Sequence, residues 1–276
     1  MKITVKDNNV VIEELENFTL EQTLDCGQAF RWQAIDENTW HGVAFGRYLK
    51  LGMCGSTLTL YDVSLEEFET VWKQYLDLER DYKSIISILS SDPTLKTATS
   101  YAGGIRILNQ DPWEALCSFI ISQNNNIPRI KGIITRLCEN FGEEICDGHY
   151  SFPSAEKIAS LSLEELSVLR SGFRAKYILD AAKKVSEGII NLENLKMIDI
   201  DIARNALMTI YGVGAKVADC ALLFGLGHID AFPKDVWIKR VMDRLYDGEL
   251  PNCAKGYSGI AQQYLFHFAR LTKLEI

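Results

Sequence analysis

The spacing of hydrophobic and polar residues changes once along the chain, close to residue 62. Upstream of that point, short β-rich stretches stand between turn residues at 9–12, 39–45 and 57–61, a pattern typical of strands. Downstream, apolar residues recur every three to four positions, which indicates amphipathic helices. The pattern therefore predicts an α+β protein in which a small N-terminal antiparallel sheet packs on a larger all-helical part.

Several helices are expected to begin at capping sequences. The segments 64–67 and 162–165 both read Ser-Leu-Glu-Glu, which forms a capping box. Asp111 precedes a proline and supplies an N-cap with a first-turn proline behind it. Apolar stripes then follow over 113–121 and 127–141, and each predicts a helix that buries one face.

Length and composition fit a protein with a sizeable core, since 47% of the 276 residues are hydrophobic. We expect a sheet domain with flanking helices over 1–93 and a helical region over 94–276. No run of 18 apolar residues occurs, and the first residues lack an apolar signal region. These features predict no membrane partner and a place in the cytosol of a bacterium or archaeon, with the chromosome.

Cysteine usage and charge limit the candidate chemistry. The seven cysteines are odd in number and contain no C-x-x-C pair, which favours reduced thiols and argues against zinc or iron–sulfur sites. The net charge of −8 counts against nucleic acid as a partner. However, acids concentrate in 62–92, whereas bases gather at 129–136, 170–176 and 234–244. DNA binding is therefore compatible with the composition but not required by it.

The segment 203–226 is a candidate helix-hairpin-helix. Helices are expected over 203–211 and 215–226, joined by the turn Gly212-Val213-Gly214. Glycine allows a sharp turn close to a ligand, and the turn amides with the second helix N-terminus form a local anion site. A DNA phosphate fits that site, while an ordinary helix corner with a glycine turn explains the spacing equally well.

Lys216 and Asp235 carry the candidate chemistry. Lys216 lies in the first turn of the second hairpin helix, where a cation opposes the helix dipole. That position favours the uncharged amine required by an imine-forming nucleophile, although a solvated lysine is the ordinary alternative. Asp235 precedes an amphipathic helix and is explained as an N-cap. It could also face Lys216 and stabilise positive charge developing on a sugar ring.

The chain resembles the helix-hairpin-helix superfamily of DNA glycosylases and, more narrowly, the 8-oxoguanine DNA glycosylase family. The resemblance runs over nearly the whole chain. Its ordered motif blocks are 26–32, 104–112, 118–127, 172–177, 207–220 with 232–236, and 259–266. It implies a DNA repair enzyme that excises 8-oxoguanine from double-stranded DNA and nicks the strand by β-elimination. It further implies a monomer without a metal or other cofactor, with room for a monovalent cation at the hairpin.

The resemblance also assigns roles to individual residues. Lys216 would attack the sugar C1′ and Asp235 would be the catalytic carboxylate. The Gly27 carbonyl would accept a hydrogen bond from N7–H of 8-oxoguanine; guanine lacks this donor, and an unmade buried bond costs about 1–3 kcal/mol. Cys220 and Phe266 would sandwich the flipped base, although plain helix core is the better explanation of both without the family. Gln262 would read the pairing edge of the flipped base.

A second group would act where the flipped base leaves the duplex. The residues implied to contact the orphaned cytosine are Asn124, Arg129 and Arg174, and Phe173 would fill the gap in the stack. A helix-end turn explains the asparagine run 124–126 as well. Eukaryotic relatives usually place Tyr where Phe173 stands and His where Trp237 stands, which leaves the opposite-base preference and one phosphate contact open.

Two alternatives compete with this interpretation. A monofunctional alkylated-base glycosylase of the same superfamily would keep Asp235 but lack the lysine, so Lys216 argues against it. A non-enzymatic helix-hairpin-helix protein would only bind the DNA backbone. Gln28 and Arg31 carry no catalytic role; they either buttress the Gly27 loop or are ordinary polar residues of a strand.

Overall fold

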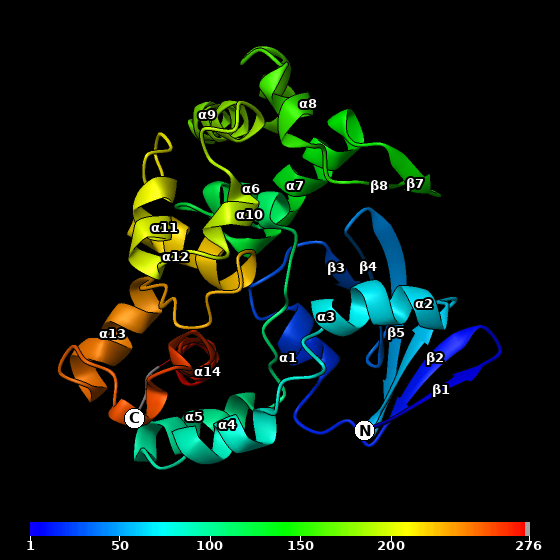
Figure 1. The fold of residues 1–276 in the computed structure, drawn as a ribbon, viewed down its shortest axis with the longest axis vertical. Helices are drawn as coiled ribbons and strands as arrows, with labels where there is room; N and C mark the ends of the chain where they lie inside the picture. The colour runs from blue at the N-terminus through cyan, green and yellow to red at the C-terminus, as the bar shows by residue number, and fades with distance from the viewer. Residues whose placement is uncertain (274–276) are drawn as a thin grey trace.

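The computed structural model describes residues 1–273, and its N-terminal part is an antiparallel six-stranded sheet with strand order β1-β2-β6-β5-β4-β3 (Figure 1). The strands are β1 (Lys2–Lys6), β2 (Asn9–Glu13), β3 (Trp32–Ala34), β4 (Thr39–Ala44), β5 (Arg47–Cys54) and β6 (Thr57–Tyr61). The sheet predicted upstream of residue 62 is therefore confirmed. A short helix, α1 (Leu20–Leu24), interrupts it.

Alternation along the strands gives the sheet one buried face. In the β2–β6 pair, Val10 lies opposite Leu60 and Ile12 opposite Leu58, and all four side chains are fully buried. A helical stretch that runs through α2 (Leu65–Glu67), the π-helix η1 (Phe68–Trp72) and α3 (Lys73–Tyr75) packs its aromatic side chains into this cluster. The sheet and this stretch therefore share a hydrophobic core.

The rest of the described chain is mainly helical and surrounds a second core. Its helices are α4 (Tyr82–Leu89), α5 (Pro93–Ala102), α6 (Pro112–Ile121), α7 (Ile127–Phe141), α8 (Ala155–Ala159), α9 (Arg174–Ser186), α10 (Leu192–Leu195), α11 (Ile200–Leu207), α12 (Ala215–Phe224), α13 (Val236–Leu245) and α14 (Ser258–Thr272), with the 3₁₀ turns η2 (Glu165–Leu169) and η3 (Asn252–Ala254). Side chains of α4 belong to this second core, although α4 precedes residue 93. The predicted division at residues 93 and 94 stays a prediction.

The expected caps are present. Ser64 accepts a hydrogen bond from the Glu67 amide, and Asp111 accepts one from the Glu114 amide. The 162–165 segment forms a reciprocal capping box, because each partner's side chain bonds the other's backbone N–H. The apolar stripe 113–121 is buried, and α7 ends immediately before Gly142 as expected.

The structure differs from the sequence prediction at the hairpin ends and in one small ribbon. Helix α11 begins at Ile200 rather than at residue 203, because Asp199 caps the amides of Asp201 and Ile202. It also ends at Leu207, and tighter i→i+3 turns follow. A two-stranded ribbon of β7 (Glu144–Cys146) and β8 (His149–Tyr150) adds a hairpin to the part expected to be all-helical. Strands this short carry too few residues for an alternation signal.

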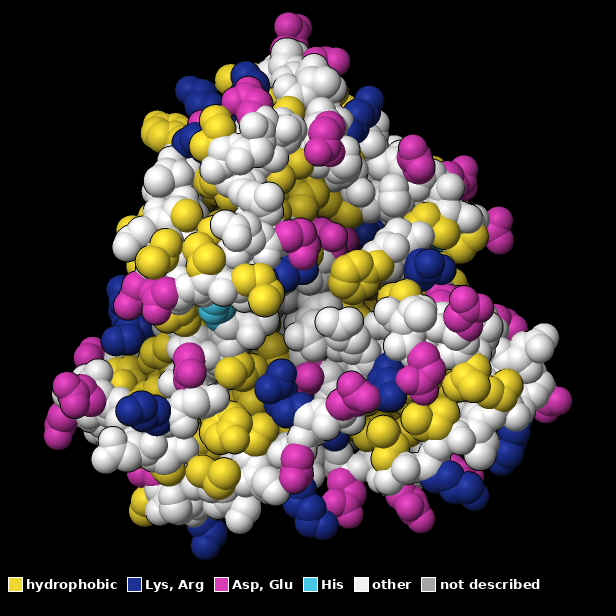
Figure 2. All heavy atoms as spheres, viewed as in Figure 1, with side chains coloured by type: hydrophobic (Ala, Val, Ile, Leu, Met, Phe, Trp, Pro, Cys, Tyr) yellow, Lys and Arg dark blue, Asp and Glu magenta, His cyan; other side chains and the backbone are white. Residues whose placement is uncertain are grey.

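Acidic and basic side chains are interspersed over the face shown in Figure 2. Within residues 1–273, no helix combines the length and the apolar character needed to cross a bilayer. A cavity of about 410 Å³ lies where the sheet part meets the helical part, with Phe45, Gln74 and Lys196 in its lining. This cavity shares no residue with the predicted site, which lies around α12, α13 and α14.

Candidate active site

The turn between α11 and α12 is closely packed on one side and open on the other. Gly212 has a φ of +78°, and a Cβ atom there would lie 2.4 Å from the Tyr177 ring, so only glycine fits. At Gly214, the N-cap of α12, an added Cβ would meet no heavy atom within 4 Å. Packing alone therefore explains Gly212, whereas the open backbone at Gly214 leaves the amides of the α12 N-terminus accessible to an anion.

Lys216 is half-buried between two helix ends. Its Nζ atom lies 3.5 Å from Ser122 Oγ and 5.5 Å from the centroid of the Phe119 ring. Ser122 is the C-cap of α6, and its hydroxyl donates to the Phe119 carbonyl at 2.8 Å. Sequence analysis did not single out Ser122 and Phe119. Their i, i+3 spacing within the block 118–127 is the signal that could have found them.

Asp235 is the N-cap of α13 and also lies near Lys216. Its Oδ1 accepts a hydrogen bond from the Ile238 amide at 2.8 Å, which makes it the N-cap of α13. Burial raises the pKa of Asp235, while the Ile238 amide and the charge of Lys216 act in the opposite direction. The carboxyl group therefore caps a helix and also lies within electrostatic reach of the Lys216 amine.

Two of the residues predicted to recognise the base, Gly27 and Phe266, lie near each other. Gly27 has a φ of +92°, and a Cβ atom there would lie 3.9 Å from Phe266 Cε1 and 4.0 Å from Ile127 Cδ1. Cys220 follows Lys216 by one helical turn and is almost fully buried. Burial raises the pKa of its thiol to about 11, and the charge of Lys216 opposes this shift. The thiol therefore remains protonated near neutral pH.

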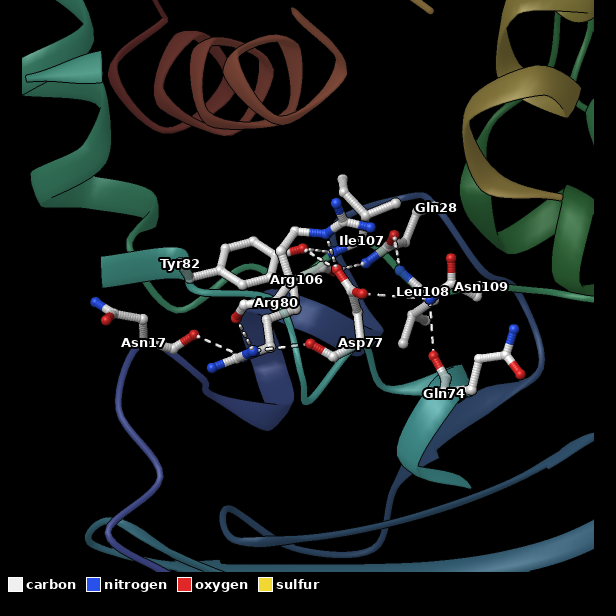
Figure 3. Close-up of polar contacts among 10 residues, drawn as sticks. All are labelled: Asn17, Gln28, Gln74, Asp77, Arg80, Tyr82, Arg106, Ile107, Leu108 and Asn109. Carbon is white, nitrogen blue, oxygen red and sulfur yellow. Dashed lines mark hydrogen bonds and ion pairs between the residues drawn. The ribbon is translucent and has the colours of Figure 1, made fainter. Parts of the chain in front are cut away.

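Gln28 fixes the backbone on which Gly27 is carried. It is fully buried, and its Nε2 donates to the carbonyls of Thr23 at 2.7 Å and Arg106 at 2.8 Å. Its Oε1 accepts from the Leu108 amide at 3.0 Å (Figure 3). Gln28 is thus a buttress of the Gly27 loop, as one of the two alternatives held. Arg31 has a similar function, because it pairs with Glu114 of α6 at 3.3 Å.

The buried Arg106 holds in place the segment between α5 and α6 that Gln28 contacts. The Arg106 guanidinium donates to backbone carbonyls of the sheet part, and its Cζ atom lies 4.6 Å from the Tyr82 ring centroid (Figure 3). The acceptors are Glu16 at 2.9 Å, Asn17 at 3.2 Å, Asp77 at 2.8 Å and Arg80 at 3.3 Å. Burial lowers the pKa of Arg106. Satisfying so many carbonyls at once makes this junction rigid.

Gln262 contacts the segment that leads into Asp235. It is buried, its Nε2 donates to the Pro233 carbonyl at 3.1 Å, and its Oε1 accepts from Gln263 Nε2 at 2.7 Å. Gln263 in turn accepts from the Cys26 thiol at 3.5 Å. This chain of contacts joins α14, the Asp235 segment and the Gly27 loop.

The residues predicted to act at the opposite base lie in the first turns of α7 and α9 and in the turns that precede these helices. Asn124 is exposed with a φ of +47°, Arg129 is exposed, and Phe173 keeps 48% of its surface accessible. Arg174 differs, because it is only 3% exposed and donates to the carbonyls of Gln123 and Asn124. Its guanidinium supports the Asn124 turn, and its contact with a base stays a prediction.

The site has no arrangement suited to a metal ion. Across the part of the chain that the structure describes, no three side chains of His, Cys, Asp or Glu are grouped to hold one. All seven cysteines are free thiols. The arrangement instead offers an amine, a carboxyl group and a thiol around one space, next to an open helix N-terminus.

Comparison with known proteins agrees with this chemistry. The model for the 8-oxoguanine DNA glycosylase N-terminal domain matches residues 10–116, and that for the HhH-GPD superfamily of base excision DNA repair proteins matches residues 117–250. A Saccharomyces cerevisiae N-glycosylase/DNA lyase is 33% identical over 82% of the chain, and an Arabidopsis thaliana N-glycosylase/DNA lyase is 32% identical over 79%. The matched regions span 68% and 64% of those two proteins.

A solved structure matches along almost the entire length. The Clostridium acetobutylicum 8-oxoguanine glycosylase/lyase, in complex with double-stranded DNA containing cytosine opposite 8-oxoguanine, superimposes with a TM-score of 0.93 at 36% identity. The superposition covers 99% of each chain. The strand order, the hairpin and the arrangement around α12 therefore belong to a fold already seen on duplex DNA.

Proposed function

The chain belongs to the 8-oxoguanine DNA glycosylase family of base excision repair proteins, and we propose that it removes 8-oxoguanine from duplex DNA and then nicks the strand. The observation that carries this proposal is the position of Lys216. Its amine lies between Ser122 and the Phe119 ring, within electrostatic reach of Asp235. A monofunctional glycosylase or a passive DNA-binding protein has no use for an amine held in this way.

The reaction follows from an amine beside a carboxylate. Uncharged Lys216 attacks the sugar C1′, an N–C bond forms, and the bond from C1′ to the base breaks. The base leaves with the bonding electrons and takes up a proton. The negative charge of Asp235 stabilises the positive charge that develops on the sugar. Ring opening then gives an imine between Lys216 and C1′.

Strand nicking uses the same imine. Loss of a proton from C2′ lets the C3′–O bond break, and the 3′ phosphate leaves as the electrons form a C=C bond. Hydrolysis of the imine releases Lys216. The amine carries out each step without metal or redox chemistry, and we propose that no cofactor takes part. A monovalent cation at the hairpin would act only on phosphate binding.

Base recognition rests on the Gly27 carbonyl. 8-Oxoguanine carries a proton at N7 that the carbonyl accepts, whereas guanine presents a lone pair there and leaves a buried acceptor without a donor. Cys220 and Phe266 hold the two faces of the flipped base. Gln262 reads its pairing edge, exchanging its bond to Pro233 for one to the base.

The opposite strand is read by the first turns of α7 and α9 and by the turns that precede these helices. Phe173 fills the gap left by the flipped nucleotide, which offsets part of the few kcal/mol that flipping costs. Asn124, Arg129 and Arg174 contact the orphaned cytosine. For Arg174, this requires that the guanidinium leave the carbonyls it contacts in the present structure. The protein acts as a monomer beside the chromosome in a bacterial or archaeal cytosol.

Borohydride trapping tests the proposal. Reduction of the imine should link the native protein covalently to a duplex containing 8-oxoguanine opposite cytosine. Lys216→Gln should bind the same duplex without forming the covalent adduct or cleaving the strand. Failure of the native protein to be trapped would favour a monofunctional glycosylase, and cleavage by Lys216→Gln would remove Lys216 from the mechanism.

A further inference from the structure

Three cations around Asp235 are held by aromatic rings. Each lies over the ring of a residue two to four positions away in the sequence. The pairs are Lys234 over Phe232 at 6.0 Å, Arg240 over Trp237 at 5.3 Å and Arg270 over Phe266 at 5.4 Å. All three cations are exposed to solvent.

These cations are not held by direct contact with a carboxylate of the described residues. None of Lys234, Arg240 and Arg270 forms an ion pair within residues 1–273. Other cations of the chain, such as Lys73 and Arg204, each pair with two carboxylates. The chain has 37 acidic and 29 basic residues, so its negative net charge conceals this local group of cations without ion pairs.

The two arginines lie on helices that are next to residues of the candidate active site: α13 is capped by Asp235, and α14 carries Gln262 and Phe266. Trp237 and Arg240 stand on one face of α13, which Asp235 caps, and Phe266 and Arg270 stand on one face of α14. The two helices pack together (Figure 1, orange and red). Burial raises the pKa of Asp235, and the charge of Arg270 is one of the effects that oppose it. Arg270 therefore acts on the catalytic carboxyl group.

A ring and a carboxylate hold an arginine differently. A carboxylate neutralises the guanidinium and occupies its N–H groups, whereas an aromatic face attracts the charge and leaves the edge N–H groups free. The ring also restricts the side chain, so less entropy is lost when an anion binds. A phosphate accepts the fork of N–H groups that the guanidinium presents.

We propose that Arg240 and Arg270, held over Trp237 and Phe266, bind backbone phosphates next to the flipped nucleotide. The inference rests on the proposed function, since it requires the damaged strand to pass over α13 and α14. It adds a second phosphate-binding region to the hairpin turn at 212–214. It also gives Phe266 a dual role, as a base-stacking ring and as the platform of a phosphate-binding arginine.

Salt dependence of DNA binding tests this proposal without requiring excision. Affinity of Lys216→Gln protein for an undamaged and for an 8-oxoguanine duplex is measured from 50 to 300 mM KCl. Adding Arg240→Gln or Arg270→Gln should weaken binding several-fold to both duplexes. Each should also make the plot of log affinity against log salt less steep by about 0.9, the value for one lost phosphate contact.

A matched control and a platform variant complete the test. Lys50 lies 5.1 Å over the Tyr61 ring of the sheet, away from the site, so Lys50→Gln removes an equivalent stacked charge and should leave the slope unchanged. Trp237→Leu keeps the Arg240 charge and should weaken affinity with little change in slope. If both arginine variants keep the native slope, the proposed phosphate contacts are wrong. If Trp237→Leu keeps the native affinity, the proposed role of the Trp237 ring in holding Arg240 is wrong. Borohydride trapping of the imine is measured separately, in protein that retains Lys216, so that failure of the proposed function can be told apart from failure of this inference.

Discussion

The amine of Lys216 lies 3.5 Å from the hydroxyl of Ser122, so the N-terminal end of α12 meets the C-terminal end of α6 at the proposed nucleophile. The N-terminus of α12 repels a cation, whereas the C-terminus of α6 and the face of the Phe119 ring attract one. The Ser122 hydroxyl donates to Phe119 and turns a lone pair toward the amine. This arrangement fixes the position of the Lys216 amine but provides no strong hydrogen-bond or ion-pair partner for it.

Ser122→Ala should therefore slow imine formation without weakening DNA binding. One hydrogen bond between neutral groups contributes about 0.5–1.5 kcal/mol, so we expect a loss of about 3- to 10-fold in the single-turnover rate. Ser122→Thr keeps the hydroxyl and should restore most of the rate. The exposed Ser160→Ala is the control. An unchanged rate in Ser122→Ala would show that Ser122 has no positioning role.

Asp235→Asn should separate the two roles of that residue. Asparagine caps helices as well as aspartate does, so α13 and the folded state should be retained. The negative charge is lost, and base excision should slow by on the order of 100-fold, as when one electrostatic stabiliser of a transition state is removed. Asp235→Ala should lose the cap as well and unfold at a lower temperature. Near-native excision by the asparagine variant would leave only the capping role.

The same substitution has a pH signature. Burial raises the pKa of Asp235 above its unfolded value, so the folded state binds this proton more tightly than the unfolded state. The contribution of Asp235 to the free energy of unfolding therefore falls as the pH rises from about 3.9 through the raised pKa, and stays constant above it. Excision should lose rate on acidification through that raised pKa. Asp235→Asn should remove both dependences, measured by chemical unfolding and single-turnover assays.

Gly27→Ala tests the backbone that offers the carbonyl. A residue with a side chain is strained at a φ of +92°, and its Cβ would contact Phe266 and Ile127. We expect a stability loss of about 1 kcal/mol or more, together with a marked loss of 8-oxoguanine excision. Gly55→Ala is a matched control, since its φ is +58° and an added Cβ meets nothing within 4 Å. It should lose stability and keep its excision rate, whereas a similar rate loss in both would point to instability alone.

The sequence predicts the parts of this site that depend on local pattern. The hairpin turn, the Asp235 cap and the change from strand to helix each need only neighbouring residues. Contacts between distant segments are different. Ser122 reaches Lys216 across 94 positions, and Gln28 reaches Leu108 across 80. No periodicity encodes such pairs. The contact between Arg270 and Phe266 joins residues one helical turn apart and could have been predicted, but a cation over a ring leaves no distinctive sequence motif.

Phe173 offers a test of how the flipped state is stabilised. Its ring is 48% exposed, lies tilted against the Tyr177 ring with the centroids 5.5 Å apart, and has the Arg174 guanidinium 4.5 Å from its centroid. Phe173→Ala should therefore fold normally. Without the ring, the gap in the stack stays empty, and excision opposite cytosine should slow by about 10-fold or more, because flipping costs a few kcal/mol.

The defect should depend on the opposite strand. When 8-oxoguanine stands opposite an abasic position, no base pair has to be broken, so the ring contributes less and Phe173→Ala should approach the native rate. Phe45→Ala, a change at a ring of similar exposure (43%) on the β4–β5 turn, should match the native protein on both duplexes. The measurement is the single-turnover excision rate on each duplex. An equal loss on the two duplexes would mean that Phe173 acts after flipping, on the chemistry or on the geometry of the Asn124 turn, because a wedge cannot matter equally where there is no pair to open.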